Sequence, residues 1–194
     1  MSTPRPIRAD AARNRDAIVA AARVAFDRGE LDRRFDDFAS LAGVGTGTLY
    51  RHFPTRELLA EAVYRAEVQA LCQHARQLLV DGPPVQALAT FLHDFVDRTS
   101  TRPGLARTLA DLMRQQPEAQ AHGARALKEA LDNLVTAATR DGGLGPEVTV
   151  GVVMTALHGI GSSYGRPGWQ ADAKGLISVL IQENARPATA RDDH

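Results

Sequence analysis

The sequence predicts an all-α protein of about nine helices, and three observations support this fold class. Apolar residues recur at helical three- and four-residue spacing along most of the chain, and no segment alternates convincingly as a strand does. Pro and Gly interrupt these periodic segments at intervals typical of helix lengths. The 194 residues are 44% hydrophobic and 24% charged, which suits a globular protein with a sizeable core.

The first three expected helices come before Pro54. Apolar spacing over 18–26 predicts the first helix, which Gly29 can end by adopting a left-handed backbone. A second, short helix over 35–42 carries one apolar face. A third helix follows the turn 43–45 and ends before Pro54, because proline disfavours a helical backbone in the residue that precedes it.

The remaining expected helices follow Pro54. Thr55 can cap the fourth helix, and Pro83 and Pro84 separate it from the fifth. Pro146 suits the first turn of a later helix that runs to about Tyr164. The expected helical segments downstream of Thr55 are centred on 59–70, 85–96, 105–113, 124–135, 146–164 and 172–184.

Composition excludes several classes of function. Basic and acidic residues balance at 23 each, so any nucleic-acid binding must rely on local charge. No secretory signal is visible, and the longest apolar stretch, 148–160, is too short to span a bilayer, so we expect a cytoplasmic protein. Cys72 is the only cysteine, and we interpret it as a small buried apolar residue. The histidines lack metal-ligand spacing, so no metal is expected. No cofactor is expected either.

The segment GVGTGTLYRHFPTRELL (43–59) concentrates glycines and aromatic residues. A dinucleotide-binding loop requires G-x-G-x-x-G between a strand and a helix, whereas here the glycines are spaced by two and a helix precedes them. Leu49 and Phe53 are expected in the core. Two short helices joined by a Gly-containing turn are typical of a helix-turn-helix, whose second helix enters the major groove of DNA.

The stretch FDDFASLAGVGTGTLYRHFPTRELL resembles the DNA-binding domain of the tetracycline-repressor (TetR) family of bacterial transcriptional regulators. The resemblance covers about residues 13–60 and includes the A-G-V turn, the G-T-L-Y-x-H-F helix and the start of the fourth helix. It implies that helix three faces the groove and that Arg56 holds a phosphate. The predicted DNA-binding residues are Arg34, Gly45, Thr46, Gly47, Thr48, Tyr50, Arg51, His52 and Arg56.

One departure from the family pattern concerns the start of helix two. Many members have Thr or Ser there, whereas this chain has Arg33 and Arg34. Arginine accepts no hydrogen bond, so we expect Asp32 or Asp36 to cap this helix and Arg34 to face a phosphate. The N-terminal arm, with Arg5, Arg8, Arg13 and Arg15, either adds DNA contacts or is a solvated tail.

The resemblance also implies a larger C-terminal domain that binds ligand and dimerises. We expect a helix-turn-helix domain with its arm over 1–56, a helical effector-binding and dimerisation domain over 57–185, and a disordered tail over 186–194. Small residues at i, i+4 spacing and excess apolar residues in the last two helices predict a dimer interface, with intrachain core as the alternative. Its candidate residues are Val148, Gly151, Val152, Thr155, Gly159, Ile177, Leu180 and Ile181.

A ligand cavity is expected among the remaining helices, again by resemblance. Its candidate lining residues are Phe91, Phe95, Leu109, Met113, Leu131, Met154 and His158, which suit a small, largely apolar effector. Each of these residues, taken singly, is more often an ordinary core residue than a ligand contact.

The sequence therefore predicts a non-enzymatic, homodimeric DNA-binding regulator, and in particular a ligand-responsive repressor of a pseudo-palindromic operator. Two alternatives come from other classes: an interaction adaptor with a vestigial helix-turn-helix, and a helical enzyme. No nucleophile–base pair, paired-carboxylate motif or metal spacing supports the enzyme.

Overall fold

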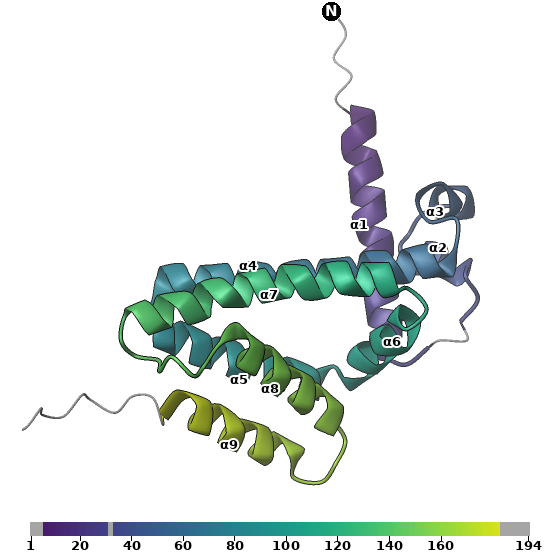
Figure 1. Cartoon of the computed structure of the whole chain (residues 1–194). Helices are drawn as coiled ribbons and strands as arrows, with labels where there is room; N and C mark the ends of the chain where they lie inside the picture. Colours follow the sequence, from purple (N-terminus) through teal and green to yellow (C-terminus); the bar gives the residue numbers. More distant parts are fainter. Residues whose placement is uncertain (1–5, 31–32, 183–194) are drawn as a thin grey trace, which may run out of the picture. The chain divides into compact units, whose positions relative to one another are not determined.

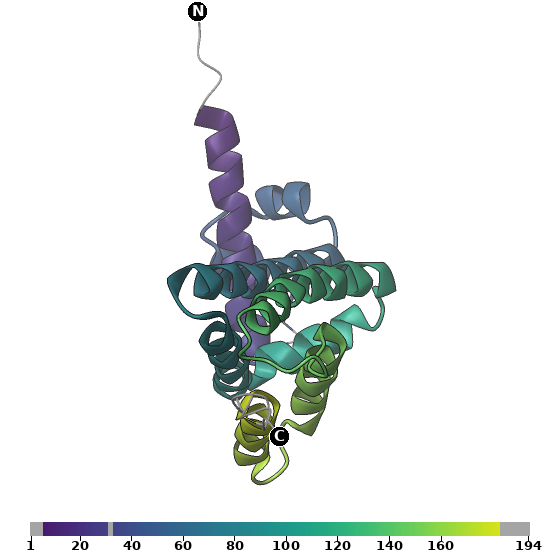
Figure 2. The same ribbon diagram turned by 60° about the vertical axis from the view of Figure 1, so that its left-hand side comes forward.

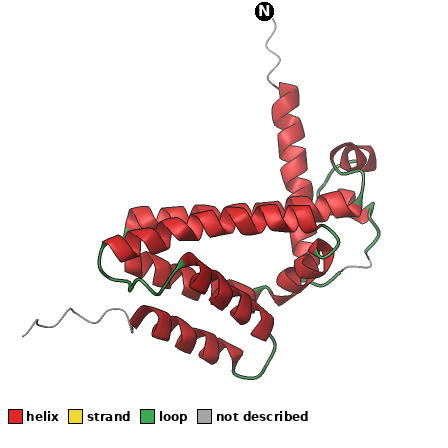
Figure 3. Cartoon of the chain, viewed as in Figure 1, coloured by secondary structure: helices red, strands yellow, loops and turns green. Residues whose placement is uncertain are grey.

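The computed structural model describes residues 6–30 and 33–182. Their regular secondary structure is entirely α-helical and comprises nine helices, which confirms the predicted fold class (Figures 1 and 3). The helices are α1 (Pro6–Asp27), α2 (Asp37–Leu41), α3 (Thr46–His52), α4 (Arg56–Asp81), α5 (Pro84–Thr101), α6 (Pro103–Met113), α7 (Pro117–Arg140), α8 (Val150–Ser163) and α9 (Trp169–Gln182). None of these described helices combines the length and the apolar character that a membrane crossing requires.

The chain forms two compact units that interleave along the sequence. The first contains the chain up to Glu67 together with Arg102–Gly123, and the second contains Val68–Thr101 and the chain from Ala124 onward. Helices α4 and α7 therefore each contribute residues to both units, as their continuous ribbons show (Figure 2). These units describe packing, and the functional domain limits at residues 56 and 185 remain a prediction.

The first unit packs α1, α2, α3, α6 and the start of α4 around an aromatic core. Phe26 and Phe38 are fully buried and meet edge to face, with ring centroids 5.8 Å apart. A hydrogen bond joins α6 to the end of α1: the buried Thr108 hydroxyl donates to the Phe26 carbonyl at 3.2 Å. Helices α1, α2 and α3 thus share one core with α6.

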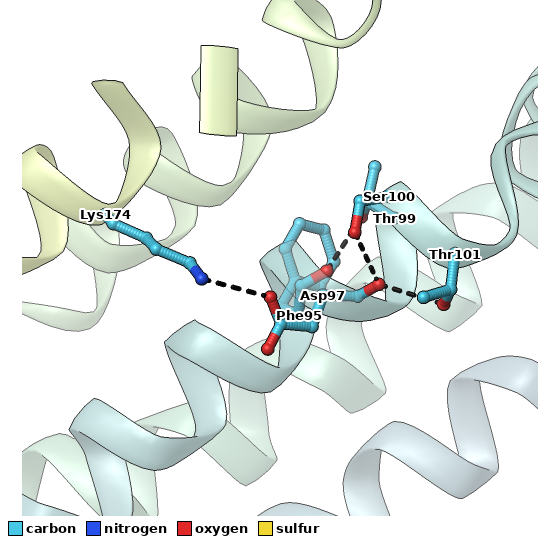
Figure 4. Close-up of polar contacts among 6 residues, drawn as sticks. All are labelled: Phe95, Asp97, Thr99, Ser100, Thr101 and Lys174. Carbon is cyan, nitrogen blue, oxygen red and sulfur yellow. Dashed lines mark hydrogen bonds and ion pairs between the residues drawn. The ribbon is translucent and has the colours of Figure 1, made fainter. Parts of the chain in front are cut away.

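The second unit packs α5, α8 and α9 with the remaining parts of α4 and α7. Leu88, Leu131 and Val153 are fully buried in this core. Lys174 on α9 and Asp97 on α5 form an ion pair of 3.4 Å (Figure 4). The hydroxyls of the last turn of α5 donate hydrogen bonds to backbone carbonyls of the same helix, so their polar groups are satisfied within α5.

Several local predictions can be compared with the helix ends. Thr55 caps α4 as expected, since its hydroxyl accepts a hydrogen bond of 3.3 Å from the Leu58 amide. The predicted start of the eighth helix at Pro146 was wrong: α8 begins at Val150, because the Thr149 side chain accepts from the Val152 amide at 3.3 Å. Helix α9 begins at Trp169, before the expected 172. The predicted tail over 186–194 lies outside the described residues.

Candidate nucleic-acid interface

The turn between α2 and α3 sets the geometry of the candidate interface. Gly43 has φ +67°, a left-handed conformation that glycine adopts without the steric cost of a side chain. The Val44 amide then donates back to the Ala39 carbonyl at 2.9 Å, which closes the end of α2. Gly45, in an extended conformation, precedes the first turn of α3. This is the tight connection that a helix-turn-helix requires.

Two apolar side chains determine which face of α3 is presented to solvent. Leu49 is fully buried and Phe53, just after the helix, is 3% exposed. Leu49 and Phe53 are four positions apart and so lie on the same side, and their burial leaves the opposite side of α3 facing solvent. Four of the predicted DNA-binding residues on α3 are exposed, and the structure brings them together on one short helix: Thr46, Gly47, Tyr50 and Arg51. Thr48 and His52 are half-buried.

Arg51 lies along the surface of its own helix. Its Nε donates to the Gly47 carbonyl at 3.0 Å, and a terminal nitrogen donates to the Thr48 hydroxyl at 3.2 Å. Because both contacts are local and exposed, Arg51 can exchange them for groups on DNA at low cost. The guanidinium thus carries positive charge on the outer face of α3.

Tyr50 is held by two residues from the α2 region. Its hydroxyl donates a hydrogen bond of 2.8 Å to Oδ1 of Asp36, and its ring meets Phe35 edge to face at 5.4 Å. The hydrogen bond to Asp36 is the main reason that the pKa of the Tyr50 phenol is raised. Asp36 makes no side-chain cap of α2, so the expectation that it would cap this helix was wrong. The other expected cap, Asp32, lies outside the described residues.

The basic residues around α3 occupy different environments. Arg34 is exposed, whereas Arg56 is half-buried, donates to the Arg33 carbonyl and lies 5.5 Å above the Phe38 ring. Arg15 of the predicted N-terminal arm belongs to α1 and lies 5.3 Å above the Phe53 ring. Arg5 of the same arm lies outside the described residues.

Sequence reasoning missed the role of Asp36 and Phe35 as supports of Tyr50. Asp36 is separated from Tyr50 by 14 positions, and no local pattern signals a hydrogen bond across a turn. The acid at the start of α2 was interpreted as a cap because carboxylates are common there. Only the crossing of the two helices shows which role Asp36 takes.

The predicted ligand-binding residues do not form one cluster. Phe91, Phe95, Leu131 and Met154 pack in the core of the second unit, whereas Leu109 and Met113 belong to the core of the first. His158 is exposed. Sequence reasoning did not foresee the contacts of His74 in this unit. Its Nε2 lies 2.6 Å from a carboxylate oxygen of Asp94, and its ring lies 6.1 Å from the Phe91 ring in a tilted arrangement. Ligand binding by these residues remains a prediction.

The predicted dimer-interface residues divide between core and surface. Val148 and Ile177 are 4% and 1% exposed, so these two residues belong to the core of the second unit and not to its surface. On α8, the side that carries Gly151, Val152, Thr155 and Gly159 is exposed. Leu180 and Ile181 are half-buried on α9, which packs against α8.

Two further features concern other chemistry. Cys72 is 6% exposed in the core of the second unit, which confirms its interpretation as a small buried residue. Among the residues that the structure describes, no group of three or more His, Cys, Asp or Glu side chains is placed to hold a metal ion.

Helix α3 has an exposed polar face, and a turn that contains Gly43 joins it to α2. This arrangement is that of a helix-turn-helix DNA-binding protein. Comparison with known families gives the particular class. Residues 17–63 match the bacterial regulatory proteins of the tetR family, and residues 83–182 match the C-terminal domain of SbtR-like transcriptional regulators. The chain belongs to the TetR family of transcriptional regulators, which are not enzymes.

Individual relatives agree with this assignment. The crystal structure of the TetR transcriptional regulator SCO0520 from Streptomyces coelicolor is 34% identical, with a TM-score of 0.71 over 90% of this chain and 99% of that one. The HTH-type transcriptional regulator SAR0097 of Staphylococcus aureus (strain MRSA252) is 32% identical over 77 residues, which span 39% of this chain and 40% of that relative. The structure of RolR in complex with resorcinol shares the fold at 17% identity, with a TM-score of 0.62 over 96% of this chain and all of that one.

Proposed function

We propose that this regulator is a ligand-responsive repressor that binds a pseudo-palindromic operator as a homodimer in the cytoplasm. The observation that carries the proposal is the outer face of α3, where Thr46, Gly47 and Arg51 are exposed together above the buried Leu49. Small residues allow the helix backbone to approach DNA closely, and the arginine supplies charge and hydrogen-bond donors.

Dimerisation is the second part of the proposal. One α3 reads one half-site, so specific binding requires two copies related by a two-fold axis. Helices α8 and α9 expose large apolar side chains that a monomer would leave in water: Val152 is 38% exposed, Leu176 40% and Val179 52%. Burying these side chains between two copies is favourable by about 25 cal/mol per Å². We therefore place the dimer interface on these two helices.

Ligand response is the third part. RolR, which shares the fold, is described in complex with resorcinol, and this supports a small, largely apolar effector for the present chain. Helix α4 follows α3 in the chain and runs without a break from Arg56 in the first unit to Asp81 in the second. A shift of α4 on effector binding would change the placement of α3. By linkage, operator and effector would weaken each other's binding by the same factor.

The proposal is tested by fluorescence anisotropy with purified full-length protein, its own upstream intergenic DNA and a scrambled duplex at several salt concentrations. We expect tight binding with a clear preference over the scramble, and loss of that preference in Tyr50→Ala. Equal, weak binding to both duplexes would indicate that the operator lies elsewhere, and selection from genomic DNA fragments would then be used to find it. If that selection also enriched no sequence, an adaptor with a vestigial helix-turn-helix would be the better description.

A further inference from the structure

We infer that Asp36 and Tyr50 act together as a paired hydrogen-bond acceptor that selects cytosine, and rejects guanine, at one position of each operator half-site. This inference rests on the proposed binding of α3 in the major groove. It assigns a base-reading role to Asp36, which lies at the start of α2 and outside the recognition helix.

The acceptor character follows from where the Tyr50 proton is placed. A phenol has a single O–H donor, and Tyr50 donates it to Oδ1 of Asp36 at 2.8 Å. The phenol oxygen is then left with lone pairs alone, and an ionised carboxylate is an acceptor only. Every polar function that this pair offers beyond its internal hydrogen bond is therefore an acceptor.

The pair is also held in place before any DNA arrives. The Tyr50 ring packs edge to face on Phe35 at 5.4 Å, and Phe35 in turn packs on the fully buried Phe38 at 6.1 Å. Tyr50 is nevertheless 46% exposed, on the same short helix as the exposed Thr46, Gly47 and Arg51. An exposed phenol that is held rigidly beside a half-buried carboxylate suits base reading, because little conformational freedom is lost on binding.

Electrostatics decide which group on DNA this pair can meet. Phosphate oxygens are acceptors and carry negative charge, so the Asp36 carboxylate repels them. In the major groove the donors are the amino groups of cytosine and adenine, whereas guanine presents two acceptors and thymine one. Adenine also presents the acceptor N7 beside its amino group, which opposes a second acceptor. Cytosine, which presents its amino group alone, is thus the best match.

Selection from a random duplex library with the full-length protein tests this inference. The wild type is expected to enrich a palindrome with a cytosine that is preferred over guanine by about tenfold or more. Tyr50→Phe and Asp36→Asn should each lose most of that preference at this position and keep it elsewhere. Asp36→Asn should further shift the preference toward adenine, because an amide pairs with both N6 and N7 of that base.

Asp37→Asn is the matched control, because it removes the same charge from the adjacent residue. Thermal melts establish that all three variants are folded. The base-reading role is overturned if Tyr50→Phe and Asp36→Asn keep the cytosine preference. It is also overturned if Tyr50→Phe weakens binding to all sequences equally and lowers the salt slope, because that result indicates a phosphate contact. If the wild type itself enriches no sequence, both the proposed operator binding and the base-reading pair are overturned.

Discussion

Gly104 lies so close to Asp27 that a Cβ atom built on the glycine would be 1.8 Å from the Asp27 carbonyl oxygen. This contact joins the first turn of α6 to the last residue of α1, next to the hydrogen bond between Thr108 and Phe26. Because the atom in the way belongs to the backbone, no side-chain rotation can relieve it. The attachment of α6 to the DNA-binding helices therefore depends on a glycine.

Gly104→Ala is expected to lower the free energy of unfolding by about 1–3 kcal/mol, because α6 must move away from α1 to admit a methyl group. Urea denaturation measures the change. Gly82→Ala is the matched control, since a Cβ at Gly82 meets nothing within 4 Å. Equal midpoints for the two variants would show that α6 adjusts without cost.

Arg34 and Arg56 are both predicted to contact phosphate, and the structure separates their effects. Arg34→Ala should weaken DNA binding and reduce the salt slope by about one, with stability unchanged. Arg56→Ala should weaken binding and also destabilise the fold, because Arg56 bonds the Arg33 carbonyl and lies over Phe38. Salt-dependent anisotropy and urea denaturation measure the two effects. A stable Arg56→Ala protein would contradict the structural part of this role.

Cys72 is expected to react slowly with a disulfide reagent in the native protein. Burial raises the pKa of its thiol, so at a given pH less of the reactive thiolate is present than for an exposed cysteine. The fraction of thiolate, and with it the rate, grows only as the pH approaches the raised pKa. The absorbance of released thiolate follows the reaction, with the same protein in concentrated guanidinium as the control. Equal rates in the two conditions would mean that the thiol is accessible.

The surface of α8 and α9 should be required for dimerisation. The double variant Val152→Glu and Val179→Glu is expected to sediment as a monomer, because four carboxylates would meet in the proposed interface. Val80→Glu is the matched control, since Val80 is 80% exposed on α4, outside that interface. Analytical ultracentrifugation distinguishes the states. A double variant that remained dimeric would place the interface elsewhere.

Much of the candidate interface could be predicted because its determinants are local. The helical spacing of Leu49 and Phe53 predicts their burial, and both are buried. Gly43 in the turn and Thr55 before α4 act through residues at most five positions away. Backbone conformation and capping depend on such short-range contacts, so a sequence displays them directly.

Other features depend on contacts between distant segments. The apolar residues of α6 predict a helix with one buried face, yet nothing in them indicates that Leu109 and Met113 pack with α1 rather than with Phe91. Apolar burial is non-directional, so a stripe of apolar residues predicts that one helix face is buried but does not indicate which segment packs against it. The predicted ligand-binding set was therefore divided between two cores.

The sequence by itself predicted the all-α fold of about nine helices, the helix-turn-helix and the resemblance to the TetR family, because periodicity, turn residues and a specific local motif carry that information. Only the tertiary structure decided that Asp36 holds Tyr50 instead of capping α2, and that α6 joins the DNA-binding unit. The physical reason is the same in both cases. Hydrogen bonds and packing between distant segments depend on how helices cross, and that crossing is set by the whole core.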